Sequence, residues 1–321
     1  MARSLLSLPL LTLLFSASLA HAVNPEWKAV FQPLPEVAAS ASNPVTPQRV
    51  ALGRALYNDT RLSVGNDISC NSCHRLDNFG VDNEPTSPGT KGQRGDRNSP
   101  SSFNAAIHIA QFWDGRAETV EKQALGPILN PKEMAMPSEK EVLKRLKGDP
   151  NTVAAFQAAF PGERDPVTYA NVGNAIGAFE RTLMTPSKLD RYLKGDDAAL
   201  SDAEKKGARL FVETGCATCH NGIGIGGGMY QKLGLVKPYP TTDAGRFAVT
   251  KNESDKMVFK VPSLRNVEKT GPYFHDGSVK TLPEAVSTMA EYQLGKKLSP
   301  EQVTDIVVFL KALTAEPARG S

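Results

Sequence analysis

Apolar residues recur at helical spacing in two well-separated stretches of this 321-residue chain. Steps of three and four residues place the apolar side chains on one side of a helix. Each stretch therefore predicts an amphipathic helix whose apolar face belongs to a core. The residues are Tyr169, Val172, Ile176, Phe179 and Leu183 in the first stretch, and Val303, Ile306, Val307 and Leu310 in the second.

Two earlier stretches resemble each other and predict a repeated helix. ALGRALYND at residues 51–59 and KKGARLFVE at residues 205–213 share the pattern Gly-x-x-Leu followed by an aromatic residue. The chain therefore reads as two similar halves, each opening on one helix and closing on another. Helix-start signals support three of these elements: Thr46 with Pro47, Ser201 with Glu204, and Ser299 with Pro300 and Gln302.

The pattern predicts a mainly α protein with two domains and long loops. Alternation typical of strands is scarce, whereas 23 prolines and 26 glycines are spread along the chain. The polar stretch at residues 185–200 is punctuated by Gly and Pro and is interpreted as a linker. We therefore predict an N-terminal domain over residues 23–184 and a C-terminal domain over residues 185–321.

The first 22 residues predict a secretory signal peptide. They contain one early arginine, Arg3, then an apolar run, then the small-x-small ending Ala20-His21-Ala22. The apolar run is shorter than the roughly 20 residues that span a bilayer, and no later stretch is a better candidate. A retained anchor is the alternative. We predict an exported, periplasmic chain without a membrane span, cleaved near Ala22.

Charge is nearly balanced, and the cysteines fall in two pairs. The chain has 37 Lys plus Arg against 34 Asp plus Glu, which gives no indication of nucleic-acid binding. All four cysteines lie in CNSCH at residues 70–74 and CATCH at residues 216–220. Cysteines three apart pair poorly with each other. The alternatives are one shared zinc site or two thioredoxin-like pairs, but the latter need a strand–helix alternation that is missing here.

The pentapeptide Cys-x-x-Cys-His is the attachment sequence of c-type haem. Two thiols at this spacing reach both vinyl groups of a porphyrin, and the next histidine lies under the iron. Two copies predict two haem groups. The glycines of NGIGIGGG, residues 221–228, match a dinucleotide-binding pattern but do not follow a strand, so we expect a loop near the haem edge. Spacing does not choose a second iron ligand among Met229, Met257 and Met289.

Both pentapeptides lie within longer stretches that resemble the bacterial dihaem cytochrome c peroxidases over nearly the whole mature chain. These stretches are NSPSSFNAAIHIAQFWDGRA, KVPSLRNVEKTGPYFHDGS and TLPEAVSTMAEYQLG. The resemblance implies two cytochrome c-like domains. It makes the haem of Cys70, Cys73 and His74 peroxidatic, and makes the haem of Cys216, Cys219 and His220 an electron-transfer group with Met289 as its second iron ligand.

The resemblance also implies roles for residues outside the pentapeptides. Between the haems it implies an electron relay, beside the peroxidatic iron an acid and an amide, and between the domains a calcium ion held by oxygen ligands. It further implies a homodimer. The matching residues are Trp113 for the relay, Glu133 and Gln123 for the acid and the amide, Asn98, Thr270 and Pro272 for calcium, and His275 for hydrogen bonding near the electron-transfer haem, with His108 structural.

One position departs from the family pattern. Many members carry a distal histidine just before the RNSP sequence, and Thr90 stands at that position here, with no histidine between His74 and His108. Threonine is a poor haem ligand. We therefore expect the N-terminal haem to be five-coordinate or water-bound as isolated, unless Lys91 or His108 replaces the missing ligand.

Three functions follow from these observations. The first is a periplasmic peroxidase that reduces hydrogen peroxide to water with electrons from a monohaem cytochrome c or a blue-copper protein. The second is oxidation of a protein substrate in cofactor maturation. Such relatives carry tyrosine where this chain has Met289, but Tyr292 lies nearby in sequence and keeps this function open. The third is a passive dihaem electron carrier.

Overall fold

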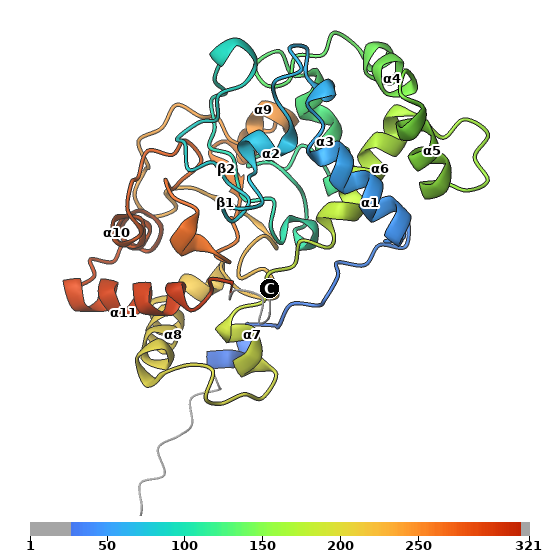
Figure 1. Cartoon of the computed structure of the whole chain (residues 1–321). Coiled ribbons are helices and arrows are strands. Elements are labelled where there is room, and N and C mark those ends of the chain that lie inside the picture. Colours follow the sequence, from blue (N-terminus) through green and yellow to red (C-terminus); the bar gives the residue numbers. More distant parts are fainter. Residues whose placement is uncertain (1–26, 316–321) are drawn as a thin grey trace, which may run out of the picture.

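The structure, a computed structural model, describes residues 27–315. Helices form two groups, joined by long loops and one small sheet (Figure 1). The predicted signal peptide at residues 1–22 lies outside the described residues. Among the residues described, no helix is long and apolar enough to cross a membrane.

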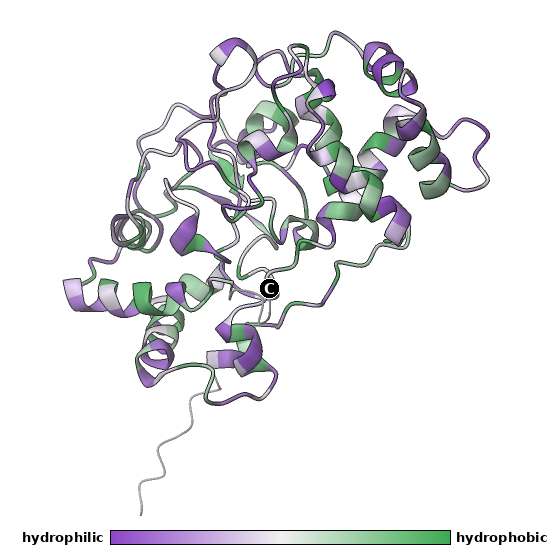
Figure 2. Cartoon of the chain, viewed as in Figure 1, coloured by the Kyte–Doolittle hydropathy of each residue, from purple (hydrophilic) through white to green (hydrophobic). Residues whose placement is uncertain are grey.

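The first group surrounds α6 (Tyr169–Glu180), which packs against α1 (Pro47–Tyr57) on one side and α3 (Val120–Leu129) on another. The shared core includes Tyr57, Ile176 and Phe179, none of which is exposed. Figure 2 shows hydrophobic residues along α1 and α6 and a largely hydrophilic α4 at the periphery. The remaining helices are α2 (Cys70–Cys73), α4 (Glu139–Lys147) and α5 (Pro150–Ala159).

The second group is built on the contact between α8 (Asp202–Thr214) and α11 (Pro300–Lys311), with α10 (Leu282–Leu294) against α11. Phe309 and Ile306 of α11 are buried in this second core. Strand β1 (Tyr230–Lys232) pairs with β2 (Val258–Lys260) in antiparallel register, and Tyr230 lies opposite Lys260. The remaining helices are α7 (Lys188–Leu193) and α9 (Phe247–Thr250).

The helix-start signals lie where the sequence predicted them. Thr46 caps α1 by accepting a hydrogen bond from the Arg49 N–H at 3.3 Å, and Pro47 is the first helical residue. Ser201 with Glu204, and Ser299 with Gln302, form capping boxes at the starts of α8 and α11. Each box satisfies two backbone N–H groups that the helix itself leaves unpaired.

The repeated glycine marks the crossing of two helices in each group. A Cβ atom on Gly53 of α1 would lie 1.9 Å from the Ala175 carbonyl oxygen of α6. A Cβ on Gly207 of α8 would lie 2.1 Å from the Asp305 carbonyl oxygen of α11. The similarity of the two sequence stretches therefore reflects one packing solution used twice, in which only glycine lets the two backbones approach this closely.

The stretch interpreted as a linker, residues 185–200, is instead a packed part of the second group. It contains α7, where Leu189 is fully buried and the Asp190 carboxylate pairs with Arg265 at 2.8 and 3.0 Å. The Leu34 N–H also donates to Asp190 at 2.7 Å. Phe31 belongs to the same core. Composition alone suggested a linker because the polar side chains of this stretch bind residues that are distant in the sequence.

Substituting alanine for either crossing glycine tests the packing interpretation. We expect Gly53→Ala and Gly207→Ala to lower the free energy of unfolding by about 1–3 kcal/mol, because the added methyl group overlaps a carbonyl oxygen. In an exposed helix the same change would stabilise by about 1 kcal/mol. Urea unfolding followed by circular dichroism measures the difference, with exposed Arg209→Ala on α8 as the control.

Candidate functional site

Each pentapeptide folds into a single tight turn. The His74 N–H donates to the Cys70 carbonyl at 2.9 Å, and the His220 N–H donates to the Cys216 carbonyl at 3.0 Å. The first turn is α2, and the second follows Gly215, a left-handed residue that ends α8. Because both copies have the same hydrogen bond, both hold two thiols and an imidazole in the same local arrangement.

The four half-buried thiols have raised pKa values, unlike those of redox or zinc sites. Burial raises the pKa of Cys73 and of Cys216 to about 11, and it also raises the pKa of Cys70 and Cys219. Reactive and metal-binding cysteines are thiolates with lowered pKa values. Within residues 27–315, no cluster of three or more His, Cys, Asp or Glu side chains could hold a metal ion.

Both histidines are held neutral. Burial lowers the pKa of His74, and it lowers the pKa of His220 to about 4. In both rings the Nδ1 atom is buried and has no hydrogen bond of ordinary geometry. The Pro100 carbonyl lies close enough to His74, and the Pro262 carbonyl close enough to His220, to raise the pKa of each ring in part. A metal-bound imidazole donates its free N–H to such a carbonyl. The residues therefore fit haem ligation.

Two cavities adjoin the pentapeptides. The His74 cavity has a volume of about 760 Å³, and Cys70, Cys73 and His74 are in its wall. The His220 cavity has a volume of about 250 Å³, and Cys216, His220 and Met289 are in its wall. The position of both spaces against the thiols suits a porphyrin. Of the residues predicted around the peroxidatic haem, Trp113, Gln123 and Glu133 all line the His74 cavity.

Trp113 lies in the wall that the two cavities share. Its indole N–H donates to the Asn98 carbonyl at 2.9 Å, and its own carbonyl accepts from the Lys260 N–H at 2.8 Å. His275, which also lines both cavities, stands edge-on to the indole with ring centres 6.5 Å apart. The indole is thus fixed from both helix groups at the boundary between the cavities.

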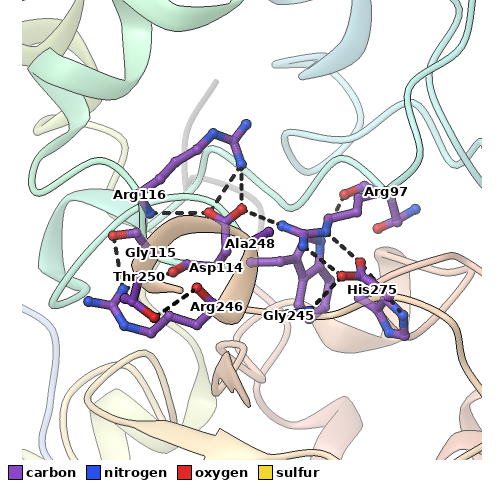
Figure 3. Close-up of polar contacts among 12 residues, drawn as sticks. Arg97, Asp114, Gly115, Arg116, Gly245, Arg246, Ala248, Thr250 and His275 are labelled. Atoms are coloured by element: carbon purple, nitrogen blue, oxygen red, sulfur yellow. Dashed lines mark hydrogen bonds and ion pairs between the residues drawn. The ribbon is translucent and has the colours of Figure 1, made fainter. Parts of the chain in front are cut away.

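A network of ion pairs extends from this boundary, as Figure 3 shows. Arg97 donates to Asp114 at 2.6 Å and to both oxygens of Asp243, at 2.7 and 2.8 Å. Asp114 also accepts from Arg116. Arg246 donates to the Asp114 carbonyl at 2.9 Å. Because Arg97 and Asp243 are 146 residues apart, this network ties the loops of the two halves together next to Trp113.

Glu133 lies on a turn after α3 and is half-buried. Burial raises its pKa, while the Arg116 charge and a 2.9 Å hydrogen bond from the Asn130 side chain lower it in part. A carboxyl whose proton affinity is raised is suited to both accepting and donating a proton near neutral pH. Gln123 is half-buried on α3 in the same cavity wall.

Thr90 packs on the turn that carries Glu133. Its N–H donates to the Glu133 carbonyl at 2.7 Å, and the side chain is 3 % exposed. The neighbouring Gly89 fits so closely that a Cβ there would lie 2.1 Å from the Lys132 carbonyl oxygen. Thr90 is not among the cavity-lining residues, exposed Lys91 is not either, and His108 lines the other cavity. None of the three side chains reaches the His74 cavity.

Met289 of α10 is the methionine, among the three candidates, that lines the His220 cavity. Tyr292 lies one turn later and does not line it; its ring packs on Tyr239 at 5.3 Å. The glycine loop passes close to the proximal ring, since a Cβ on Gly226 would lie 3.2 Å from His220 Nδ1. His275 is buried and hydrogen-bonded to Thr241 at 3.1 Å.

The three residues predicted to bind calcium lie together in the wall of the His220 cavity: Asn98, Thr270 and Pro272. The Asn98 side chain donates its amide to the Glu84 carbonyl at 2.9 Å, and its backbone carbonyl accepts from Trp113.

Comparison with known proteins agrees with this geometry. The family model for di-haem cytochrome c peroxidase matches residues 47–198, and that for cytochrome c matches residues 204–314. The cytochrome c551 peroxidase of Pseudomonas aeruginosa is 46 % identical, covering 98 % of this chain and 93 % of that protein. The chain belongs to the di-haem cytochrome c peroxidase family.

Two further relatives support the assignment. The cytochrome c551 peroxidase of Nitrosomonas europaea is 45 % identical, covering 98 % of this chain and 91 % of that protein. The crystal structure of a MauG-like protein associated with microbial copper homeostasis has a TM-score of 0.78 and 30 % identity, covering 88 % of this chain and 94 % of that chain. This family member is thus a dihaem peroxidase with two cytochrome c-type domains and two haem c groups.

Several charged residues of the site could not be predicted from the sequence, because no local motif distinguishes them. The importance of Arg97 and Asp243 is visible only from their contact in the folded chain. That of Lys260 is visible only from its burial. Glu180 is the last residue of α6 and lines the His74 cavity with 6 % exposure. Burial and repulsion from Glu121 raise its pKa to about 8, although Arg181 opposes the shift.

The raised pKa of Glu180 predicts a pH-dependent stability. The folded protein keeps this proton up to about pH 8, whereas the unfolded chain releases it near the ordinary pKa of 4.5, so the folded state loses stability as pH rises between these values. Glu180→Gln removes the effect. We expect its stability advantage over the wild type to grow from about pH 5 to about pH 8, by up to about 1.4 kcal/mol per pH unit.

Thermal unfolding of the haem-loaded proteins across this range measures the difference. Exposed Glu139→Gln is the matched control and should track the wild type at every pH. An advantage of Glu180→Gln that stays constant with pH contradicts the assignment of this proton.

Proposed function

We propose that this peroxidase is periplasmic and reduces hydrogen peroxide with two electrons and two protons to two waters. The electrons come one at a time from a small donor, a monohaem cytochrome c or a blue-copper protein. The observation that carries the proposal is a half-buried carboxyl of raised pKa, Glu133, in the wall of the cavity that also holds the His74 pentapeptide. Residues 1–22 support export, and the family resemblance supports a homodimer.

The residues of the two pentapeptides hold the two haem groups. His74 is the iron ligand in one haem, and His220 is the iron ligand in the other. Haem iron with an open coordination position supplies peroxide binding and electron transfer to the O–O bond. Met289 is proposed as the second protein ligand of the His220 haem because it lines that cavity. A methionine ligand raises the reduction potential and closes the iron, which suits a group that only accepts and passes electrons.

Glu133 is proposed to move the proton on which O–O cleavage depends. The carboxylate takes a proton from the inner oxygen of peroxide and returns it to the outer oxygen, which leaves as water. The Asn130 amide holds one carboxyl oxygen at 2.9 Å and so orients the group. Arg116 lowers the pKa of Glu133 from the value that burial alone would give, which keeps the carboxylate available as a base. Gln123 offers an amide to the same peroxide.

Electrons are proposed to pass from the His220 haem to the His74 haem by way of Trp113. Its position in the shared wall and its two backbone hydrogen bonds support this role. We also propose a calcium ion bound by the side-chain oxygen of Asn98 and the carbonyls of Thr270 and Pro272. Oxygen ligands of this kind suit calcium. Bound there, the ion would fix the same Asn98 backbone that accepts the indole hydrogen bond.

Glu133→Gln tests the enzymatic role directly. We expect peroxide-dependent oxidation of a reduced monohaem cytochrome c to slow by about 100- to 10,000-fold, because an amide cannot accept the proton. Haem content and optical spectra should stay as in the wild type. Exposed Glu139→Gln, six residues away, serves as the control and should keep full activity.

The outcomes separate the alternative functions. Negligible turnover in the wild type, with no change on Glu133→Gln, would identify a passive electron carrier. Slow turnover with small donors, but oxidation of one partner protein, would identify a cofactor-maturation enzyme. The structure favours the peroxidase over the latter, because Met289 and not Tyr292 faces the cavity.

We further propose that the His74 haem is open to peroxide without prior reduction. Thr90 occupies the position of the usual inhibitory histidine, and its backbone bond to Glu133 holds it outside the cavity wall. Lys91 is exposed, and His108 belongs to the His220 cavity.

Electron paramagnetic resonance of the fully oxidised protein checks this proposal. We expect one high-spin and one low-spin haem, and peroxide turnover without a lag. Addition of one electron per protein before peroxide should leave the rate within about twofold, a difference of about 0.4 kcal/mol in barrier. Two low-spin haems that ignore peroxide until half-reduced would falsify it.

A further inference from the structure

Lys260 is a buried cation without a partner in the wall of the His220 cavity. It ends β2, and it is 6 % exposed between the buried residues Phe259 and Val261. Its backbone N–H is bonded to Trp113, but over residues 27–315 its ammonium group makes no ion pair and no hydrogen bond. Burial of an ammonium group without an anion is costly. Consistent with that cost, burial lowers the pKa of Lys260 to about 8.

The other charges around this cavity do not compensate it. The residues that line the His220 cavity include Lys232, Lys260 and Arg265, but no Asp or Glu. Arg265 is neutralised by Asp190, which it contacts at 2.8 and 3.0 Å. Lys232 is exposed to solvent. Lys260 is therefore the one cation of this wall, among the described residues, that is both buried and uncompensated.

The His74 cavity shows the opposite arrangement. Its cations are paired with carboxylates of the chain: Arg97 with Asp114 and Asp243, Arg116 with Asp114, and Lys132 with Asp96. The chain therefore supplies a carboxylate for each cation around the His74 cavity, but it supplies none for Lys260 in the wall of the His220 cavity. A missing anion in a cavity built for a cofactor points to an anion that the cofactor brings.

We propose that Lys260 binds a propionate carboxylate of the haem c attached at Cys216 and Cys219, and that its positive charge raises the reduction potential of that haem. A nearby positive charge disfavours the ferric state, which carries one more charge than the ferrous state. The low dielectric of the buried wall makes the interaction strong. The inference deepens the proposed function, since it rests on the His220 haem being the electron-accepting group.

Lys260 also contacts the residue that is proposed to relay electrons. The Lys260 N–H donates to the Trp113 carbonyl, so the residue that would hold the propionate also holds the proposed relay. His108 lines the same cavity, and its Nε2 atom is buried without a partner. Burial lowers the pKa of His108, and the charges of Lys260 and Arg265 lower it further. A carboxylate at Lys260 would offset that repulsion between two neighbouring basic groups.

Redox titration of the haem-loaded protein tests the proposal. In Lys260→Met, which keeps the apolar stem and removes the charge, we expect the equilibrium constant for reduction of the high-potential haem to fall about tenfold, a drop of about 59 mV. Lys260→Arg should keep the potential near that of the wild type. Lys256→Met, at an exposed lysine four residues away, is the control and should change nothing.

A second neutral variant covers the case in which Lys260→Met misfolds, and a change of buffer anion identifies the source of the carboxylate or other anion. If Lys260→Met attaches too little haem, Lys260→Gln, which is neutral but still a hydrogen-bond donor, should show the same drop. A potential that depends on phosphate or chloride concentration would mean a solution anion and overturn the propionate assignment. Unchanged potentials in both neutral variants would overturn the proposal entirely. Peroxide turnover measured in parallel reports separately on the proposed function, because Glu133 lies in the other cavity.

Discussion

The tight turn of each Cys-x-x-Cys-His segment is the constraint on which the rest of the structure depends. The hydrogen bond from the histidine N–H to the first cysteine carbonyl, 2.9 Å in one copy and 3.0 Å in the other, fixes two thiols and an imidazole together. The helices around each turn form the walls of its cavity, and the glycines at the two helix crossings, Gly53 and Gly207, let the helix backbones approach closely.

The two cavities share one wall, and that wall is rigid because it belongs to both halves of the chain. Trp113 is bonded through its indole to Asn98 and through its carbonyl to Lys260. Arg97 ties Asp114 to Asp243 beside it, in the network of Figure 3. These ion pairs are partly buried and bidentate, so they hold geometry better than exposed pairs do. The proposed electron relay depends on fixed distances, and these contacts hold Trp113 in place.

Sequence reasoning found what is encoded locally. The pentapeptides, the helix caps at Thr46, Ser201 and Ser299, and the apolar face of α6 all follow from spacing over a few residues. Contacts between distant residues lay beyond it. The segment taken for a linker is packed because Asp190 meets Arg265, 75 residues later. For the same reason no local pattern singled out Glu180 and Lys260, which the structure places, buried, in the walls of the two cavities. The roles of Glu133, Met289 and the calcium ligands came from resemblance and stay predictions; the structure adds that Glu133 lines the His74 cavity and that Met289 and the predicted calcium ligands line the His220 cavity.

The distribution of charge explains why two similar halves can do different work. Around His74, the cations are paired with the chain's own carboxylates, and two further carboxyls, Glu133 and Glu180, have raised pKa values. Such a wall can exchange protons with a small substrate. Around His220 there is no carboxyl in the wall, an apolar methionine faces the cavity, and the remaining buried charge is positive. That wall therefore lacks the carboxyl groups that the other wall has, and the proposed effect of its positive charge is to favour the reduced state of the haem. The repeated backbone thus provides two equivalent sites, and the side chains around them separate proton chemistry from electron storage.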